Sequence, residues 1–309
     1  MLSAGGTNTG MTWSALPDPG QAAFPDAHWR VATLERLDLL RCEAGTTCGL
    51  PRSAQRGGKC GKAMDTKLRH IWHCRTGAAR LRIHFAIVGA LARELRSSGG
   101  NVDLERALPE LARLLESGEL EEAIMDLTCW WPGGLEWYGV DVTMRFAGAA
   151  RYIGAERRVG LAVARGEREK EARYGHGVLP LAFEAGGRLG AKSELTLRRL
   201  ADAAAEHVGG FGTRQGLVMR WRRRCEAALF FSSADAVLCA LGHSAAGART
   251  AANWCARGTA AASAATSAPA AAALALCHDP DAEDCVHDGL AALLAEDEEA
   301  AQAMHGPGM

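Results

Sequence analysis

Residues 122–144, EAIMDLTCWWPGGLEWYGVDVTM, contain two apolar runs on either side of a Pro-Gly-Gly sequence. The runs are rich in Trp, Val, Ile and Thr, the residue types that are enriched in strands. Proline and glycine between two such runs are typical of a tight turn. The stretch therefore predicts a β-hairpin that turns at Pro132-Gly133-Gly134.

The register of this hairpin would bring two carboxylates together. If the turn is centred on the Gly-Gly pair, Asp126 falls directly opposite Asp141. Directly opposed side chains share a face and lie about 5 Å apart, where two like charges repel unless a cation lies between them. Hard carboxylate oxygens suit Mg²⁺, so we predict that Asp126 and Asp141 bind magnesium. The alternatives are a register shifted by one residue, or two aspartates at exposed strand ends.

Helices and one further strand are expected around the hairpin. Apolar residues recur at helical spacing from Ala78 to Ser98, and the glycine pair at 99–100 would end that helix. Further elements are expected at 107–117 (helix), 155–174 (helix), 177–184 (strand), 193–207 (helix) and 214–241 (helix). The order helix, β-hairpin, helix, strand, helix predicts an α/β fold.

Two side chains of the helix expected at 155–174 are candidates for the same site. Lys170 and Tyr174 are one helical turn apart. A lysine beside two metal-bound carboxylates can orient a water molecule or stabilise charge on a phosphate. The alternative for Lys170 is a position on a solvated helix face. Glu184, at the end of the next strand, would either approach the same pocket or simply end the strand.

A group of cysteines and histidines precedes the predicted α/β region. Three cysteines and one histidine have the spacing C-x11-C-x9-H-x3-C: Cys48, Cys60, His70 and Cys74. Three thiolates and one imidazole are a common tetrahedral set for structural zinc, so the segment is predicted to be a closed zinc knuckle. Cys42 and His73 are spare candidates. The alternative is a set of scattered buried cysteines with a surface histidine.

Composition divides the 309-residue chain into four parts. We expect a flexible Gly-, Pro- and Ser-rich leader at 1–27, the zinc-knuckle module at 28–76, the α/β domain at 77–243 and a low-complexity, alanine-rich tail with an acidic end at 244–309. The net charge is −1, but arginine is concentrated between 145 and 224, which predicts a basic face for an anionic partner. A second metal cluster is an open alternative in the tail: Cys277, His278, Cys285 and His287.

The sequence does not predict a membrane protein. Its first twenty residues lack the basic start and apolar run of a signal peptide, and no stretch approaches the roughly 20 apolar residues that span a bilayer. We expect an intracellular, nuclear protein whose ten cysteines are buried or metal-bound rather than disulfide-bonded. The oligomeric state stays open.

Taken in order, these motifs resemble the C-terminal region of site-specific non-LTR retrotransposon proteins and related reverse-transcriptase-derived proteins. In that region a zinc knuckle precedes a restriction-like endonuclease. The resemblance covers residues 42–205 and rests on the knuckle, on Ile83-His84-Phe85, on Ile124-Met125-Asp126, on VDVT around Asp141, and on Lys170 with Tyr174.

The resemblance implies a restriction-endonuclease-like core and an Mg²⁺-dependent endonuclease that hydrolyses DNA phosphodiester bonds. It assigns catalytic roles to Asp126, Asp141 and Lys170. It assigns nucleic-acid binding to the following residues: Arg82, His84 and Tyr174. The alternatives are a catalytically inactive module that binds DNA or RNA, and a decayed retroelement fragment.

The sequence departs from the family's pattern at three places. The lysine-proline pair that precedes the family's first aspartate is Ile124-Met125 here. The family's arginine before the histidine is Ile83, unless Arg82 substitutes for it. The first two knuckle cysteines are usually closer together in the family than they are in this chain.

Overall fold

The computed structural model describes most of the chain between residues 26 and 242. The described ranges are 26–36, 39–52, 58–74, 79–115, 117–149, 151–152, 158–207 and 213–242. They form two compact units, a larger one from residues 24–40 and 83–234 and a smaller one from residues 41–82 and 235–242. The tail beyond residue 242, with its four Cys and His residues at 277–287, lies outside the described residues, as does the predicted leader up to residue 25.

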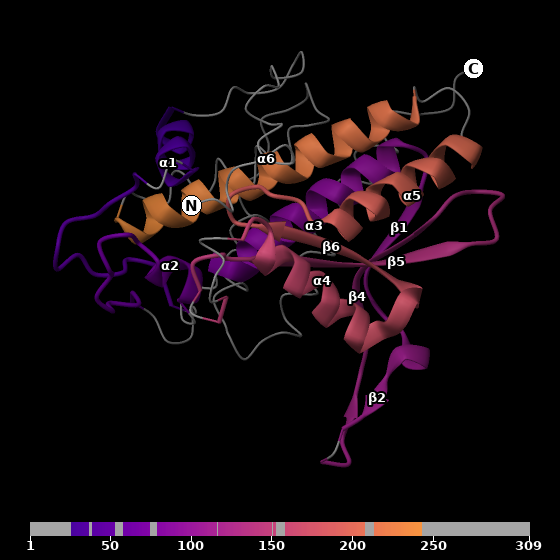
Figure 1. Ribbon diagram of the computed structural model, residues 1–309, viewed down its shortest axis with the longest axis horizontal. Helices are drawn as coiled ribbons and strands as arrows, with labels where there is room; N and C mark the ends of the chain where they lie inside the picture. The colour runs from indigo at the N-terminus through magenta and orange to yellow at the C-terminus, as the bar shows by residue number, and fades with distance from the viewer. Residues whose placement is uncertain are drawn as a thin grey trace, which may run out of the picture. The chain divides into compact units, whose positions relative to one another are not determined.

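The larger unit is built on a four-stranded mixed sheet (Figure 1). Its strands lie in the order β1 (Asn101–Ala107), β4 (Ile124–Trp130), β5 (Trp137–Arg145) and β6 (Val178–Glu184). The pairs β1–β4 and β4–β5 are antiparallel, whereas β6 is parallel to β5. A parallel pair needs a crossover connection, and helix α4 (Leu161–Tyr174) lies in the segment that makes it.

The central hairpin β4–β5 has the register that the sequence predicts. Leu127 pairs with Val140, so the next step along both strands brings Asp126 opposite Asp141. In the turn, Gly133 has φ of 83°, a left-handed conformation that glycine adopts at no steric cost. The chemistry of the turn therefore sets which side chains meet at the far end of the hairpin.

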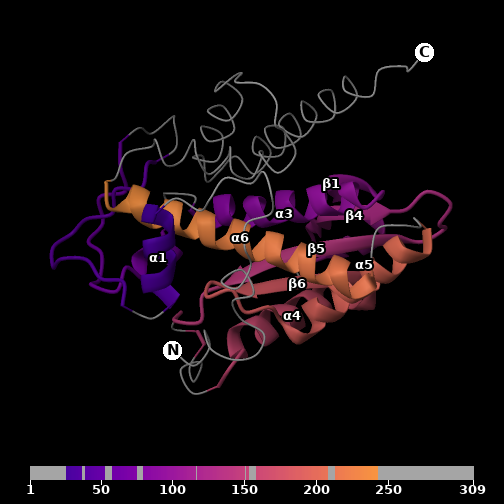
Figure 2. The ribbon, with the colours of Figure 1, turned by 90° about the horizontal axis from the view of Figure 1, so that it is seen from above.

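Helices cover the sheet. The helices of this part of the chain are α1 (Asp26–Arg36), α3 (Ala79–Ser97), α4, α5 (Ala191–His207) and α6 (Arg214–Ala240). Helix α4 packs on β5 and β6, and α5 packs on β6. The long helices α3 and α6 run along the sheet, as Figures 1 and 2 show. Seven successive residues of β5 are buried, which shows that both of its faces are covered.

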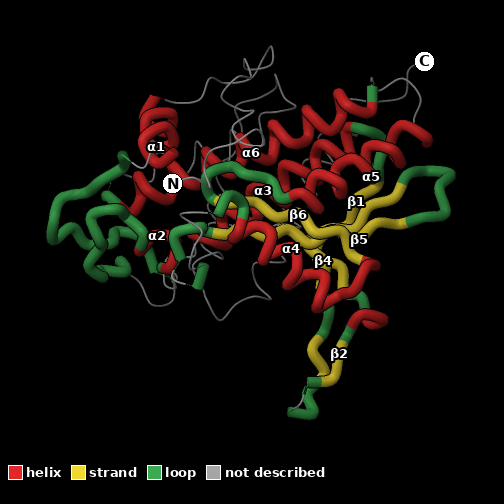
Figure 3. Tube along the Cα trace, viewed as in Figure 1, coloured by secondary structure: helices red, strands yellow, loops and turns green. Residues whose placement is uncertain are grey.

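The mixed α/β class is confirmed, and most expected elements lie within a few residues of their predicted ends. Two segments differ. The predicted helix at 107–117 is wrong, because the chain there forms a 3-10 turn η3 (Pro109–Leu111) and a short antiparallel pair, β2 (Arg113–Leu114) with β3 (Leu120–Glu121). Strand β1 was not predicted. Figure 3 shows the β2–β3 pair as an arm that extends away from the sheet.

Candidate active site and candidate metal centre

Five side chains from four elements of the larger unit meet where β4 begins. They are His84 of α3, Asp126 of β4, Asp141 of β5, and Lys170 and Tyr174 of α4. We call this set the carboxylate site. All five were singled out from the sequence. The side chains of His84, Asp126 and Lys170 are each 21% exposed, whereas Asp141 and Tyr174 are buried.

The carboxylate of Asp126 is held at both oxygens. The ring nitrogen Nε2 of His84 lies 3.0 Å from Oδ1. The backbone amide of Val142 donates a hydrogen bond to Oδ2 at 2.5 Å. This bond ties the start of β4 to β5 beyond the last paired residues, so the Asp126 side chain continues the contact between the two strands.

The carboxylate of Asp141 is bound by helix α4. Lys170 Nζ lies 2.6 Å from Oδ1 and 2.8 Å from Oδ2 of Asp141. The Tyr174 hydroxyl forms a hydrogen bond with the same carboxylate. Lysine and tyrosine reach one acceptor because residues four apart lie on one face of a helix. Helix α4 thus brings two donors to Asp141, although Lys170 is 29 residues away from Asp141 in the sequence.

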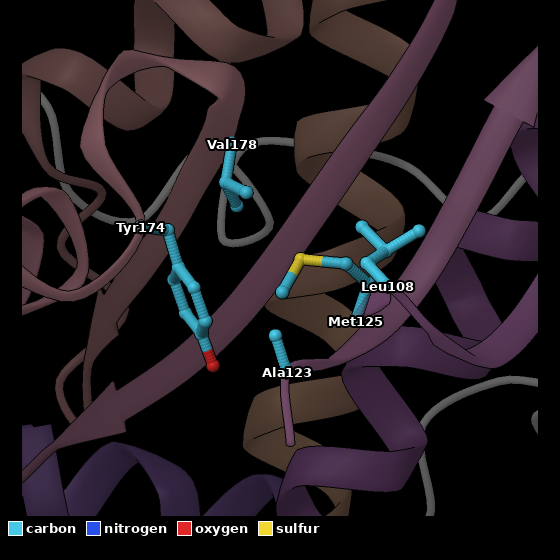
Figure 4. Packing of buried hydrophobic residues seen from close by; sticks show 5 residues of the cluster. All are labelled: Leu108, Ala123, Met125, Tyr174 and Val178. Carbon is cyan, nitrogen blue, oxygen red and sulfur yellow. The ribbon is translucent and has the colours of Figure 1, made fainter. Parts of the chain in front are cut away.

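The Tyr174 ring is anchored in an apolar cluster next to the site. The cluster consists of Leu108, Ala123, Met125, Tyr174 and Val178 (Figure 4). Figure 4 shows the aromatic ring beside these side chains, with its hydroxyl at the end away from the backbone of Tyr174. The polar end of a buried tyrosine usually finds a hydrogen-bond partner, and here that partner is Asp141. The apolar packing fixes the ring and so fixes the donor.

The two carboxylates have opposite protonation preferences. Burial and the negative charge of Asp126 raise the pKa of Asp141 to about 6, although Lys170 opposes the shift. Burial also acts on Asp126, but His84 and the Val142 amide outweigh it and lower the pKa of Asp126. Burial favours the neutral ring of His84, yet the Asp126 charge prevails and raises the pKa of that imidazole. Asp126 is therefore the firmly ionised partner, and Asp141 is the one that a further cation would stabilise.

Tyr174 remains protonated near neutral pH. Burial and the neighbouring Asp141 raise the pKa of its hydroxyl to about 12. The hydroxyl is therefore the hydrogen-bond donor and the carboxylate is the acceptor.

Two other candidates from the sequence lie elsewhere. Glu184 is buried and accepts a hydrogen bond from the backbone amide of Val163 at 3.3 Å, in the first turn of α4. That is the opposite end of the helix from Lys170, so Glu184 supports the fold rather than the carboxylate site. Arg82 belongs to the smaller unit, where its side chain interacts with the Cys239 thiol.

The smaller unit brings together the four predicted zinc ligands. The ligand atoms of Cys48, Cys60, His70 and Cys74 all lie within 4.8 Å of one another. The two sulfurs of Cys48 and Cys74 are 4.0 Å apart, and Cys60 Sγ is 3.5 Å from His70 Nε2. A zinc tetrahedron with ordinary bond lengths separates two sulfurs by about 3.8 Å, and a sulfur from a nitrogen by about 3.5 Å. The cluster therefore fits a metal such as zinc. Cys42 and His73 are not part of it.

Local backbone structure sets this geometry. Antiparallel bridges join Thr47 with Ala63 and Pro51 with Lys59, and place the first two cysteines on neighbouring strands of one long loop. The Asp65 carboxylate accepts hydrogen bonds from the backbone amides of Lys67 at 3.0 Å and His70 at 3.2 Å. These two bonds hold the turn that leads into the one-turn helix α2 (His70–His73), after which Cys74 follows directly. The H-x3-C spacing thus corresponds to one helical turn, as expected.

The surroundings of Cys48 favour its thiol over its thiolate. A hydrogen bond with Cys74, together with burial, raises the pKa of Cys48 well above the usual range of a thiol. Metal ligation requires thiolates, and a bound cation supplies the charge that makes them stable. The four side chains lie closely enough to share one cation, which is the arrangement of a closed structural site.

One ion pair between β5 and α4 was not expected from the sequence, although it lies in the arginine-rich stretch 145–224. Arg145, at the end of β5, binds Glu169 of α4 with 2.6 Å between Nη2 and Oε2. Strand alternation places residues 141, 143 and 145 on one face of β5, so an arginine on the same face as Asp141 was the available signal.

Comparison with known proteins identifies no relative. No protein-family model matches the chain, and no curated protein and no solved structure matches it significantly. Among the described helices, none is both long and apolar enough to cross a bilayer.

Proposed function

We propose that the protein is a metal-dependent nuclease that hydrolyses DNA phosphodiester bonds at the carboxylate site. The observation that carries this proposal is the convergence of Asp126, Asp141 and Lys170 at one end of a hairpin. Two acidic side chains and a lysine beside them are a set that suits phosphoryl chemistry. The order helix, hairpin, helix, strand, helix supports a restriction-endonuclease-like core for the same unit.

The donor set fits a hard divalent cation such as Mg²⁺. Magnesium is commonly bound in proteins by one or two carboxylates, with waters and substrate phosphates completing the shell. Asp126 and Asp141 supply two carboxylates, and burial together with the Asp126 charge raises the pKa of Asp141, an effect that a bound cation would oppose. When bound, the cation would supply an activated water and would neutralise charge on the phosphate.

Each residue of the site has a distinct part in this proposal. Asp126, held by His84 and the Val142 amide, stays ionised and aligned with β5. Lys170 is already within 2.6 Å of Asp141 and is long enough to turn toward a phosphate oxygen, where it would stabilise the charge of the transition state. Tyr174 holds the Asp141 carboxylate in place through its hydroxyl.

We propose that the Cys/His cluster binds zinc and orders the smaller unit. Its described residues 41–52 and 58–74 have one short helix and isolated bridges, and its other described residues, 79–82 and 235–242, include the first turn of α3 and the end of α6. A structural zinc site contributes folding free energy directly. In this role the zinc takes no part in hydrolysis.

A second candidate function is nucleic-acid binding without cleavage. Each carboxylate already has a cationic or potentially cationic partner, His84 for Asp126 and Lys170 for Asp141. A site whose charges are balanced in this way could contact nucleic acid without taking up a catalytic cation.

A plasmid nicking assay separates the two functions. The wild-type protein is expected to convert supercoiled plasmid to the open form only with Mg²⁺ or Mn²⁺. Asp126→Ala and Asp141→Ala should each reduce the rate by roughly 10²-fold or more, the usual scale for losing a group that stabilises the transition state. Asp103→Ala is the matched control, because Asp103 is an exposed aspartate of neighbouring strand β1. Nicking that is unchanged in both site variants would refute the proposal.

A further inference from the structure

A second charged cluster lies on α4 and at the end of β5, apart from the carboxylate site. It consists of Arg145, Arg151 and Arg165 around one carboxylate, Glu169, and one aromatic ring, Tyr152. We call it the arginine cluster. None of these five residues takes part in the chemistry proposed above.

One carboxylate bridges two of the guanidinium groups. Oε2 of Glu169 lies 2.6 Å from Arg145 Nη2, and Oε1 lies 3.2 Å from Arg165 Nε. Arginine is the residue type that proteins favour for recognising carboxylates and phosphates, and here two arginines converge on the two oxygens of one anion. The Glu169 carboxylate therefore lies where an anionic ligand would bind these two arginines.

The third arginine is fixed to the same group through Tyr152. The guanidinium carbons of Arg151 and Arg165 lie 4.8 Å and 5.8 Å from the centre of the Tyr152 ring. Arg165 also donates a hydrogen bond from Nη1 to the Arg151 carbonyl at 3.0 Å. Both side chains remain exposed at the surface, so their remaining donors are accessible to a ligand.

Two polar atoms of the arginine cluster have no hydrogen-bond partner among the described residues. Among the residues that the structure describes, the buried Nε of Arg145 and the buried hydroxyl of Tyr152 have no hydrogen-bond partner. Buried donors without a partner are rare in folded proteins. Two guanidinium groups, those of Arg145 and Arg165, share the Glu169 carboxylate, and Arg151 adds a third positive charge beside Tyr152.

A glycine in the middle of α4 makes room for Arg145. A Cβ atom at Gly166 would lie 2.9 Å from Arg145 Nε and 3.3 Å from the Thr143 side chain. Glycine inside a helix costs about 0.5–1 kcal/mol relative to alanine. At this position it lets the Arg145 side chain cross the helix and reach Glu169.

We propose that the arginine cluster binds a backbone phosphate of the DNA substrate, which displaces the Glu169 carboxylate from Arg165. The identity of the ligand rests on the proposed function. Arg145 follows Asp141 by four residues on the same face of β5, a separation of about 13 Å along an extended strand. Each DNA strand carries a phosphate about every 3.4 Å along the axis, so the cluster would meet the backbone within a few nucleotides of the cleaved bond.

Binding of a short labelled DNA duplex, measured without added Mg²⁺ as a function of salt, tests this site apart from cleavage. Arg165→Gln should weaken binding roughly 3- to 10-fold and reduce the salt slope by about one. Glu169→Gln should have the opposite effect and strengthen binding, because the competing anion is gone. Arg165→Lys keeps the charge and should retain most of the affinity.

The matched control is Arg198→Gln. Arg198 also pairs with a glutamate one helical turn away, and its side chain is 48% exposed, against 49% for Arg165. Arg198→Gln should bind DNA like the wild type. Equal losses in Arg165→Gln and Arg198→Gln, weaker binding in Glu169→Gln, or a wild-type protein that binds no DNA would each overturn the proposal.

The outcomes separate this site from the nuclease. The predicted binding pattern without any nicking would leave the phosphate site standing and remove the proposed hydrolysis. Nicking that needs Asp141 but is indifferent to Arg165 would remove the phosphate site alone.

Discussion

The Cys/His cluster and the carboxylate site have opposite kinds of structural support. The Cys/His cluster lies in a long loop and a one-turn helix, where its four ligand atoms converge beside a few buried apolar side chains such as Leu50, Leu68 and Ile71. The carboxylate site lies on a hairpin whose residues are mostly buried between helices. We therefore expect metal binding at the Cys/His cluster to stabilise the local fold around it. The carboxylate site should instead lower the stability of a fold that forms without it.

Removal of the metal should have the largest effect and should be confined to the smaller unit. Zinc in small structural sites contributes on the order of 10 kcal/mol to folding. Cys74→Ser is expected to abolish stoichiometric zinc binding, measured by elemental analysis, and to remove the unfolding transition of the smaller unit. The transition of the larger unit should remain.

Cys42→Ser is the control for this experiment. Cys42 lies in the same unit, and its thiol donates to the Asp65 carbonyl at 3.4 Å instead of joining the ligand group. Full zinc content in both variants would show that the cluster is a chance arrangement of buried thiols.

Loss of core packing under the hairpin should come next. Met125 is fully buried in the cluster that anchors Tyr174, whereas its neighbour Ile124 is 41% exposed. Met125→Ala should lower the free energy of unfolding of the larger unit by about 2–5 kcal/mol. Ile124→Ala should cost clearly less. A denaturant titration of both variants measures the difference, and similar losses would argue against the described register.

Part of the fold and of the carboxylate site can be predicted from the sequence alone. The Pro-Gly-Gly turn fixes the hairpin register, and the register fixes which aspartates meet, so Asp126 and Asp141 could be paired without a structure. Lys170 and Tyr174 followed from helical spacing. Each of these inferences needs only local geometry.

The parts that could not be predicted depend on tertiary contacts or on weak local signals. Strand β1 carries Asn101, Asp103 and Glu105, residue types that strands do not favour, and it forms because β4 offers an edge to pair with. The segment 107–117 has apolar residues at helical spacing, but it ends up as the arm that connects β1 with β4. The contact between Arg145 and Glu169 depends on how α4 crosses β5, which no local pattern encodes.

The smallest predicted effect is a pH dependence of stability caused by Asp141. Its pKa is raised from 3.8 to about 6 in the folded protein, so the folded state holds its proton more tightly than the unfolded state does. Wild-type stability is therefore lost as pH rises from about 4 to 6, by roughly 2–3 kcal/mol for a shift of this size. Asp141→Asn removes the titration.

The comparison of these two proteins across pH gives the test. Asp141→Asn should match the wild type near pH 4 and be more stable above pH 6, as measured by chemical unfolding of the larger unit. Parallel curves over the whole range would show that burial of the Asp141 charge has no cost. A cation bound at Asp141 would offset this cost at neutral pH.

The most direct test of the central claim is Mn²⁺ binding to the zinc-loaded protein, followed by electron paramagnetic resonance. If the hairpin holds two carboxylates for one hard cation, wild type should bind one Mn²⁺ per chain. Asp126→Asn and Asp141→Asn should each lose that ion, and Asp103→Asn should keep it. Equal Mn²⁺ binding in all four proteins, or none in the wild type, would contradict the assignment of the carboxylate site as a metal-dependent centre.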